Sequence, residues 1–254
     1  MVLSMDRWVG KVAVVTGASS GIGAAIAEAL AKEGLKVAAL ARRKGRLEEL
    51  AKKVSNQKGQ IFAIQADIAN ETDILDAFTW IKNNLGPIHI LINNAGVLPP
   101  SSGILDGQTE SWEQLYKVNV IGLSICTREA VKYMKDNKVN GHIVHINSVL
   151  GHEVIKRPYM NVYPSSKFAV TALAETLRLE LMNQKSQIKI TSVSPGLTDT
   201  EFLIPIRKNP EYKKIIDEAK ILEPQDIADA VVYVLSTPPH VQVQELTVRT
   251  VSQN

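Results

Sequence analysis

The sequence is poor in cysteine, in charge of one sign and in long apolar runs, and each shortage excludes a class of protein. Cys126 is the single cysteine, which excludes an internal disulfide framework and a multi-cysteine zinc site. It favours a reducing compartment, and we expect a cytoplasmic protein. The 29 Lys and Arg against 26 Asp and Glu leave a net charge of +3, too small and dispersed to indicate a nucleic-acid partner. No stretch reaches the roughly 18 apolar residues of a transmembrane helix, and residues 1–10 lack the apolar segment of a signal peptide.

What the chain does contain is apolar residues, 45% of its 254 positions, which is enough to bury a large core. This length is near the upper limit for one hydrophobic core. No flexible linker, low-complexity tract or internal repeat divides the chain, so we expect a single domain over residues 1–254. None of the five histidines has the spacing of metal ligands, and we expect no metal site.

Short apolar runs rich in β-branched residues alternate with helical patterns along the chain. The runs are Val12–Val15, Val37–Leu40, Ile61–Ile64, Ile88–Ile92, Ile143–Ile146, Ile188–Val193 and a last one at about Val243–Val248. Most are continuous in their polarity rather than alternating, which is typical of strands buried on both faces of a parallel sheet. Strands separated by helices in this way predict an α/β protein with a Rossmann fold, a doubly wound and mostly parallel sheet with helices on both faces.

Three local patterns predict helix ends. Gly34 follows an apolar stripe of helical period and is expected to be a C-terminal cap. Asn70 precedes an acidic first turn and is expected to be an N-cap. Ser111 with Gln114 has the form of a capping box at the start of another helix.

A glycine-rich turn, Thr16–Gly23, follows the first predicted strand and leads into a helical pattern. Glycines allow a tight turn and the close approach of a pyrophosphate, whose charge is stabilised by free N–H groups and the helix dipole. Between a strand and a helix, this turn predicts a dinucleotide site. The expected contacts are Gly17, Ser19, Ser20, Gly21, Ile22 and Gly23.

The end of the second predicted strand, Leu40–Lys44, predicts which dinucleotide binds. NAD sites usually place an acid here to bond the ribose 2′-hydroxyl, but this segment holds Arg42 and Arg43, with no acid before Glu48. A planar guanidinium binds a 2′-phosphate through paired hydrogen bonds. We therefore expect NADP(H), with Arg42 as the first contact and Arg43 as the second. The alternative is a solvated basic helix start that fits either cofactor.

Tyr163 and Lys167 are the main catalytic candidates. Because they are four residues apart, both side chains lie on one face of a helix. A nearby ammonium favours the phenolate of a tyrosine, whose ordinary pKa is ~10. Tyr163 could then exchange a proton with a substrate hydroxyl or carbonyl. Ser148 ends an apolar strand, where its hydroxyl could hold the substrate oxygen.

Five motifs, in this order and with this spacing, make the chain resemble the short-chain dehydrogenase/reductase family along essentially its whole length. They are Thr16–Gly23, Asn93–Gly96, Ser148, Tyr163–Lys167 and Pro195–Gly196. The resemblance implies that Tyr163 is the acid/base and that Ser148 stabilises the substrate. It also implies that Lys167 tunes the phenol and binds ribose, and that Asn119 belongs to a water-linked proton relay.

The same resemblance implies further contacts with the cofactor. These are Asp67, Ile68, Asn94, Ala95, Gly96, Tyr163, Lys167, Pro195, Gly196, Thr198 and Thr200. For Asp67, a turn or a helix cap is a competing role. The resemblance also implies a homodimer or homotetramer, formed through the long helices expected over Trp112–Tyr133 and Ala169–Leu181. Core packing explains the amphipathic pattern of these helices equally well.

The loop between Ser148 and Tyr163 departs from the family pattern, because the two residues are 15 apart, two more than is commonest. Loops absorb insertions at little cost, so we expect the catalytic geometry to survive. His152 in this loop could be a second acid, but a solvated loop histidine is favoured. His145 lies in a predicted buried strand and is expected to be a satisfied core residue.

Three mostly apolar segments should wall the substrate site: Val97–Leu105, Val149–Tyr159 and Leu197–Lys220, the last within a substrate-binding loop at about residues 197–223. The expected contacts are Leu98, Val154, Tyr159, Phe202 and Ile206, with Ile155 and Leu203 in the same walls. Such walls suit a small apolar alcohol or carbonyl.

The segment Val144–Ser148 with its long loop is similar to the branch of the family that holds insect farnesol dehydrogenases and reductases of hydrophobic carbonyls. We therefore favour a farnesol-like isoprenoid, with a steroid or general carbonyl as the alternative. A regulator that binds NADP(H) without turnover is less favoured, because Ser148, Tyr163 and Lys167 are all present.

Overall fold

The computed structural model of the protein describes residues 3–99, 103–155, 162–208, 210, 213, 216–217 and 220–251, and for residues 205 and 206 the backbone alone. Within this part of the chain, seven strands form one sheet in the order β3-β2-β1-β4-β5-β6-β7, and every neighbouring pair is parallel. The strands are β1 Val12–Thr16, β2 Lys36–Ala41, β3 Gln60–Gln65, β4 Ile88–Asn93, β5 His142–Ile146, β6 Lys189–Pro195 and β7 Glu245–Val248. The predicted doubly wound Rossmann sheet is confirmed.

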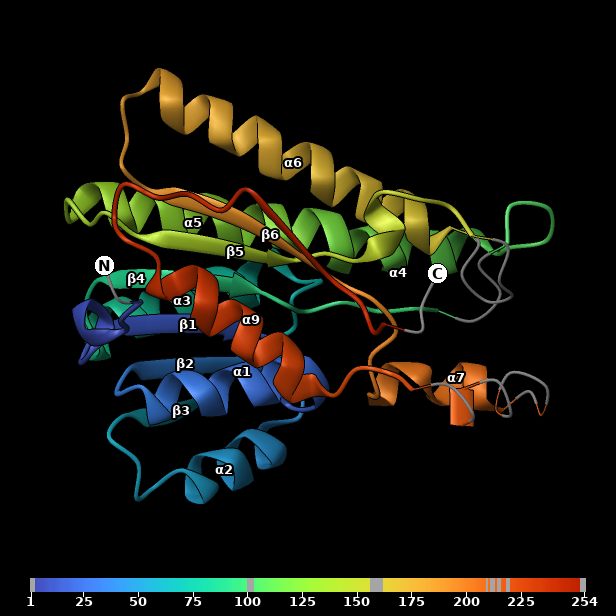
Figure 1. Ribbon diagram of the computed structural model, residues 1–254, viewed down its shortest axis with the longest axis horizontal. Helices are drawn as coiled ribbons and strands as arrows, with labels where there is room; N and C mark the ends of the chain where they lie inside the picture. Colours follow the sequence, from blue (N-terminus) through green and yellow to red (C-terminus); the bar gives the residue numbers. More distant parts are fainter. Residues whose placement is uncertain are drawn as a thin grey trace.

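Helices cover both faces of this sheet (Figure 1). One face is covered by α1 Gly21–Lys32, α2 Lys44–Lys53 and α9 Pro224–Ser236. The other is covered by α3 Glu71–Asn84, α5 Leu123–Asp136 and α6 Tyr163–Asn183. The remaining described helices are α4 Thr109–Tyr116 and α7 Ile204–Arg207, with the short turns η1 Asp6–Trp8, η2 Lys117–Gly122, η3 Val149–Gly151 and η4 Glu201–Leu203. None of the helices described is long and apolar enough to cross a membrane.

The central strands explain why the apolar runs are continuous. All five residues of β1 are buried. Ala13 and Val15 belong to the core beneath α1 and α9, whereas Val12 and Val14 belong to the core beneath α3 and α5. Successive side chains of a strand point to opposite faces, so a strand with helices on both sides needs an apolar residue at every position. By contrast, the last strand, β7, alternates between exposed and half-buried residues at the edge of the sheet.

The order of the strands creates a crevice between β1 and β4. From β1 the chain runs outward to β2 and β3, then returns to place β4 on the other side of β1. Connections leave β1 and β4 in opposite directions, and in open α/β sheets ligands bind beyond the carboxyl ends of the strands at such a point. The segment that carries α7 follows β6 and extends beyond this edge, at the right of Figure 1.

The predicted cap at Gly34 is confirmed, and its geometry is a Schellman motif. The N–H of Leu35 donates to the carbonyl of Leu30 at 3.1 Å, and the N–H of Gly34 donates to that of Ala31 at 3.0 Å. Gly34 has φ +91°, in the left-handed region where residues with a Cβ are strained.

The predicted N-cap at Asn70 is also confirmed, because its side-chain oxygen accepts from the N–H of Thr72 at 3.0 Å. The capping box at Ser111 is wrong. Helix α4 begins at Thr109, and its N-cap is Gln108, three residues before the predicted cap. The N–H groups of Ser111 and Trp112 donate to the Gln108 carbonyl. Ser111 therefore lies within the first turn. The long helix expected over Trp112–Tyr133 is interrupted, since η2 between α4 and α5 is a π-helix.

Two glycine substitutions distinguish the effect of the Gly34 cap on stability from the effect of helix propensity. Gly34→Ala should lower the free energy of unfolding by about 1 kcal/mol, because alanine is strained at this φ. The nearest atom to an added Cβ is Val9 Cγ1 at 3.4 Å, so the loss is conformational rather than steric. Gly45→Ala in α2 meets nothing within 4 Å and should raise the same free energy by about 0.5 kcal/mol. Urea unfolding followed by circular dichroism measures both, and changes of the same sign would contradict this account.

Candidate active site

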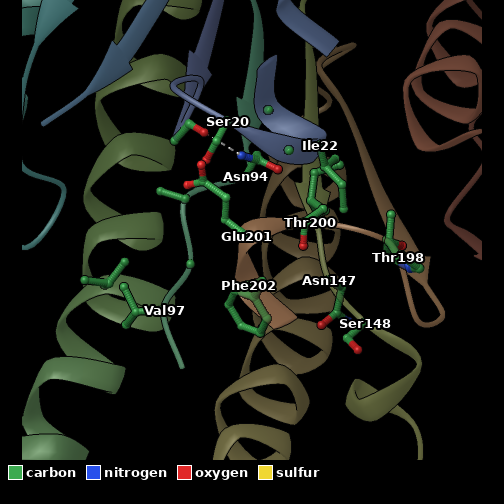
Figure 2. A pocket seen from close by; sticks show the side chains of 18 of the residues that line it. Ser20, Ile22, Asn94, Val97, Asn147, Ser148, Thr198, Thr200, Glu201 and Phe202 are labelled. Carbon is green, nitrogen blue, oxygen red and sulfur yellow. Dashed lines mark hydrogen bonds between the residues drawn. The ribbon is translucent and has the colours of Figure 1, made fainter. Parts of the chain in front are cut away.

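A cavity of about 640 Å³ lies at the carboxyl ends of the strands (Figure 2). Every residue predicted to contact the nucleotide lines it: Gly17, Ser19, Ser20, Gly21, Ile22, Gly23, Arg42, Arg43, Asp67, Ile68, Asn94, Ala95, Gly96, Tyr163, Lys167, Pro195, Gly196, Thr198 and Thr200. These residues come from six separate segments of the chain. Their meeting follows from the parallel sheet, since the carboxyl ends of parallel strands lie at one edge.

The glycine-rich turn is packed directly against the segment that follows β4. A Cβ on Gly17, whose φ is +67°, would lie 2.8 Å from the Cα of Ala95. A Cβ on Gly23 would lie 2.3 Å from Nδ2 of Asn94. The first helical turn of α1 has no side-chain cap, because Ser20 makes no such bond. The N–H groups of this turn and the dipole of α1 thus form a cradle that suits a phosphate group.

Asn94 and Thr16 hold this cradle in place. The Thr16 hydroxyl accepts from the N–H groups of Asn94 and Ala95, both at 3.0 Å. The side-chain amide of Asn94 donates back to the carbonyls of Thr16 at 2.9 Å and Gly17 at 3.3 Å. The end of β1 and the end of β4 are therefore joined by a closed set of hydrogen bonds.

The two arginines that follow β2 behave differently. Arg43 donates to the Ser19 hydroxyl at 3.0 and 3.2 Å and to the Ser20 hydroxyl at 2.8 Å, and it pairs with Glu201 at 2.8 Å. Arg42 lines the same cavity and has no ion pair with any residue that the structure describes. Arg42 is thus the guanidinium that is available to a ligand, and Arg43 ties the glycine-rich turn to the opposite wall.

Asp67 makes a turn hydrogen bond and also lines the cavity. Its Oδ1 accepts from the N–H of Ala69 at 2.9 Å, which is a turn hydrogen bond, and its own N–H donates to Asp73. The residue also lines the cavity next to Ile68. The turn fixes the position of the carboxylate at the nucleotide end of the cavity.

Tyr163, Lys167 and Ser148 meet at the other end of the cavity. Tyr163 and Lys167 are only 8% and 6% exposed, and the Lys167 ammonium lies 5.7 Å from the centre of the Tyr163 ring. Lys167 Nζ donates to the carbonyl of Ile146 at 2.8 Å. Ser148 lies two residues beyond the end of β5 and caps η3, accepting from the N–H of Leu150 at 3.1 Å. The four-residue spacing on α6 and the end of β5 together produce this cluster.

The electrostatics of the cluster differ from the expectation that Lys167 lowers the pKa of Tyr163. Burial raises the pKa of the Tyr163 phenol above its ordinary value, and a hydrogen bond with Ser148 opposes this effect in part. Burial also lowers the pKa of Lys167 to about 8. At neutral pH Tyr163 therefore keeps its proton, which makes it a proton donor in this state.

Asn119 lies in the π-helical turn η2 and is 1% exposed. Its Oδ1 accepts from the N–H of Val97 at 2.9 Å, and its Nδ2 donates to the Val97 carbonyl and the Ser166 hydroxyl, both at 3.2 Å. Asn119 does not line the cavity. Its side chain instead links the segment that follows β4 to the first turn of α6, beside Tyr163. π-turns often occur at functional sites.

The structure places some of the residues predicted to wall the substrate site at the cavity and others away from it. Phe202, Ile155 and Leu203 line the cavity, and the Phe202 ring lies 5.5 Å from the Tyr163 ring. Leu98 and Val154 do not line it. Val154 is 74% exposed, because the residues before and after it in the sequence face the cavity instead. Leu98 packs against a neighbouring apolar cluster. Tyr159 and the side chain of Ile206 lie outside the described residues.

Several further residues line the cavity. Val97, Val149, Leu150, Glu153, Leu197 and Glu201 lie in the segments predicted to wall the substrate site, although they were not singled out as contacts. Sequence reasoning missed Ala41, Ala66, Val118, Ile146, Asn147 and Arg249. Ala41, Ala66 and Ile146 lie at or next to strand ends and could have been found from the expected sheet. Glu153 and Arg249 form an ion pair at 2.5 Å across the rim, and Glu201 pairs with Arg43. No local pattern signals these long-range pairs.

The two histidines near the site are not part of its chemistry. His152 is outside the cavity lining, and its Nε2 lies 3.0 Å from Ser194 Oγ and 3.3 Å from Glu245. These contacts favour the interpretation of His152 as a loop histidine over its interpretation as a second acid. His145 is buried, and burial lowers its pKa to about 3. It is a core residue, but only its Nε2 has a partner among the described residues, Thr127 at 3.4 Å, and its Nδ1 has none.

The profile of the family described as short chain dehydrogenase matches residues 11–211. A farnesol dehydrogenase of Aedes aegypti is 48% identical, over 98% of this chain and 99% of its own length. Dehydrogenase/reductase SDR family member 11 of Mus musculus is 44% identical, over 98% of this chain and 97% of its own length.

Solved structures with the same fold have lower identities. An alcohol dehydrogenase from the archaeon Thermococcus sibiricus, complexed with 5-hydroxy-NADP, is 29% identical with a TM-score of 0.83, covering 96% of this chain and 98% of that one. The closed form of a serine dehydrogenase complexed with NADP+ is 29% identical with a TM-score of 0.85, covering 96% of both chains.

We expect the buried Lys167 side chain to lower the free energy of unfolding. Below pH 8 the folded protein holds a buried ammonium, whereas the unfolded chain solvates it, so Lys167→Met should raise the free energy of unfolding by about 1 to 2 kcal/mol at pH 7. Between pH 8 and 10.5 the folded wild type has released this proton while the unfolded chain still binds it. The gain should therefore shrink as pH rises.

Thermal unfolding of both proteins at pH 7 and pH 10 measures this difference. Lys132→Met, on the exposed face of α5, is the matched control and should stay within about 0.5 kcal/mol of the wild type. A Lys167→Met protein that is less stable than the wild type at pH 7 would contradict the assignment of a desolvated ammonium.

Proposed function

The chain belongs to the short-chain dehydrogenase/reductase family of oxidoreductases, and on that premise we propose that it transfers a hydride between NADP(H) and an apolar alcohol or the matching carbonyl. One observation carries the proposal. A phosphate cradle, a basic rim and the cluster of Tyr163, Lys167 and Ser148 all line one cavity. Nucleotide and substrate can therefore meet within a single site.

The residues present fit a dinucleotide with a 2′-phosphate. The glycine cradle leaves no room for a Cβ at Gly17 or Gly23, which suits a close approach of the pyrophosphate. Arg42 at the end of β2 has no carboxylate partner among the described residues and supports a contact with the 2′-phosphate. Two similar solved proteins are described as complexes with NADP-type ligands, which agrees with this choice.

Tyr163, Ser148 and Lys167 would divide the remaining chemistry. When bound, the nicotinamide supplies the hydride to the carbonyl carbon, or accepts it from the alcohol. In reduction, the protonated Tyr163 donates its proton to the carbonyl oxygen, and the Ser148 hydroxyl holds that oxygen by a hydrogen bond. Lys167 binds the ribose and, once its ammonium faces the phenol, stabilises the phenolate that remains. Asn119 would support a proton relay by fixing the first turn of α6.

The substrate end supports an apolar molecule, with a farnesol-like isoprenoid as the favoured one. Val149, Leu150, Ile155, Leu197, Phe202 and Leu203 supply apolar walls. The relative that is 48% identical is named a farnesol dehydrogenase. A steroid or another hydrophobic carbonyl is the alternative within the same chemistry, since apolar walls do not by themselves distinguish the two. A single domain with a substrate-binding loop at about residues 197–223 is the organisation that we propose.

The helix α6 supports a homo-oligomer, dimeric or tetrameric. Its apolar side chains Phe168, Leu179 and Met182 are 42%, 40% and 56% exposed in the single chain. Exposed apolar residues along one long helix are typical of a face that packs against another subunit. A silent NADP(H)-binding regulator is the less favoured function, because it would have no use for the buried Tyr163 and Lys167.

Tyr163→Phe keeps the ring and removes the transferable proton. We expect kcat/KM for a hydrophobic carbonyl to fall by about 10³-fold or more, while the Kd for NADPH stays within a few-fold of the wild type. Tyr133→Phe is the matched control, since Tyr133 stacks on Phe78 in α3, away from the cavity, and it should keep full turnover. Near-normal turnover of Tyr163→Phe would refute the mechanism. Nucleotide binding by the wild type without oxidation of NADPH by any carbonyl would favour the regulator.

Arg42→Asp replaces the free guanidinium with a carboxylate. The ratio of kcat/KM with NADPH to that with NADH should fall by about 10²-fold, because the new charge repels the 2′-phosphate. Lys44→Asp makes the same change of charge two residues on, outside the cavity, and should keep the wild-type ratio to within a few-fold. An unchanged ratio in Arg42→Asp would show that this residue does not read the phosphate.

A further inference from the structure

Glu201 lies at a place where the nucleotide end of the cavity meets the segment after β6. Its two carboxylate oxygens accept from two arginines, Oε2 from Arg43 at 2.8 Å and Oε1 from Arg46 at 2.5 Å. Glu201 is the first residue of η4 and lines the cavity. Figure 2 shows it extending toward Ser20, while Phe202, the next residue, points the other way. A carboxylate from the substrate side thus reaches the basic rim expected to bind a 2′-phosphate.

Each nitrogen of the Arg43 guanidinium donates at least one hydrogen bond in this arrangement. Its Nε and NH2 groups donate to the hydroxyls of Ser19 and Ser20, and its NH1 donates to Glu201. A guanidinium offers five N–H donors in a fixed plane and accepts nothing. A phosphate that takes the NH1 donor now bound to Glu201 must therefore replace the carboxylate there.

We propose that Glu201 is a specificity-determining residue whose carboxylate occupies the 2′-phosphate position on Arg43 and exchanges with that phosphate when NADP(H) binds. The inference rests on the proposed function, because it requires a cofactor with a 2′-phosphate. NAD(H) has no group that could replace the carboxylate, so Glu201 would stay on Arg43 and Arg46. Glu201 thereby weakens the binding of NADP(H) selectively, which brings its affinity closer to that of NAD(H).

The exchange is physically reasonable because the pairs are exposed and the incoming group carries more charge. The Glu201 side chain is 41% exposed, and exposed ion pairs are weak since water and salt screen them. The two arginines lower the pKa of Glu201 to about 2, so it remains an anion over the working pH range. A phosphate offers three acceptor oxygens and higher charge, and Arg42 beside it has no competing ion pair among the described residues.

The exchange would also affect the end of the cavity that holds Tyr163. Glu201 and Phe202 are adjacent, and the Phe202 ring lies 5.5 Å from the ring of Tyr163. Thr200, on the other side of Glu201, is close enough that a Cβ on Gly21 would meet its Cγ2 at 3.0 Å. Release of Glu201 from Arg43 therefore frees one of the contacts that hold this segment against the glycine-rich turn.

Glu201→Gln tests the proposal, because glutamine keeps the shape and removes the charge. The probes are 2′,5′-ADP, which carries the 2′-phosphate, and 5′-AMP, which lacks it, and calorimetric titration of the intact protein measures each Kd without any turnover. We expect the Kd for 2′,5′-ADP to tighten by about three- to tenfold, and that for 5′-AMP to change by less than about twofold.

Glu48→Gln is the matched control. Glu48 lies on α2, pairs with Lys44 at 3.9 Å and does not line the cavity, so both Kd values should stay at the wild-type level. Weaker binding of 2′,5′-ADP to Glu201→Gln, or equal tightening of both probes, would overturn the exchange. Binding by the wild-type protein distinguishes a failure of the proposed cofactor from a failure of the proposed role of Glu201. If it binds 2′,5′-ADP no more tightly than 5′-AMP, the choice of NADP fails, whereas a clear wild-type preference that Glu201→Gln leaves unchanged overturns only the role of Glu201.

Discussion

The junction between the ends of β1 and β4 is the constraint on which the rest of the site depends. Thr16 and Asn94 exchange hydrogen bonds in both directions, which brings two strand ends, and the segments that leave them, into backbone contact. Only glycine fits at Gly17 and Gly23 because this contact is so close. From Asn94 the chain runs to Val97, which Asn119 holds through both of its backbone groups. Asn119 then bonds Ser166, whose hydroxyl donates to the Tyr163 carbonyl at 2.7 Å. Two sets of hydrogen bonds, joined by the backbone between Asn94 and Val97, thus link the glycine-rich turn to helix α6.

Charge is arranged in this site at the expense of stability. The buried Lys167 ammonium has one backbone carbonyl as its hydrogen-bond partner, and its lowered pKa reflects the cost of removing it from water. At the other end of the cavity, positive charge gathers where β2 ends, and the negative charge nearest to it comes from Glu201 on a distant segment. A protein that had only to fold would gain by replacing Lys167 with an apolar residue. The presence of these charged groups agrees with a site whose charges serve a ligand.

The sequence was sufficient for the sheet and for most of the residues that line the cavity around the glycine-rich turn, because both depend on local patterns and on the rule that parallel strands end at one edge. Continuous apolar runs predicted the central strands, and Gly34 and Asn70 marked helix ends through their own backbone chemistry. The prediction failed where several local signals compete or where distant residues decide. Ser111 resembles a cap, but Gln108 begins the helix. Val154 belongs to an apolar loop, yet its neighbours occupy the cavity. The pairs of Glu201 with Arg43 and of Glu153 with Arg249 join residues about 100 or more positions apart, and no pattern along the chain can reveal them.

We propose that this one cavity brings a nicotinamide and an apolar carbonyl together for hydride transfer. Transfer of an isotope from the cofactor to the product reveals whether it does. The two C4 epimers of [4-²H]NADPH are each incubated with the protein and a hydrophobic carbonyl, and the alcohol formed is analysed by mass spectrometry. The account predicts one deuterium on the carbinol carbon with one epimer and none with the other, because a fixed site presents a single face of the ring. Unlabelled alcohol from both epimers, or no alcohol despite tight binding of NADPH, would contradict it.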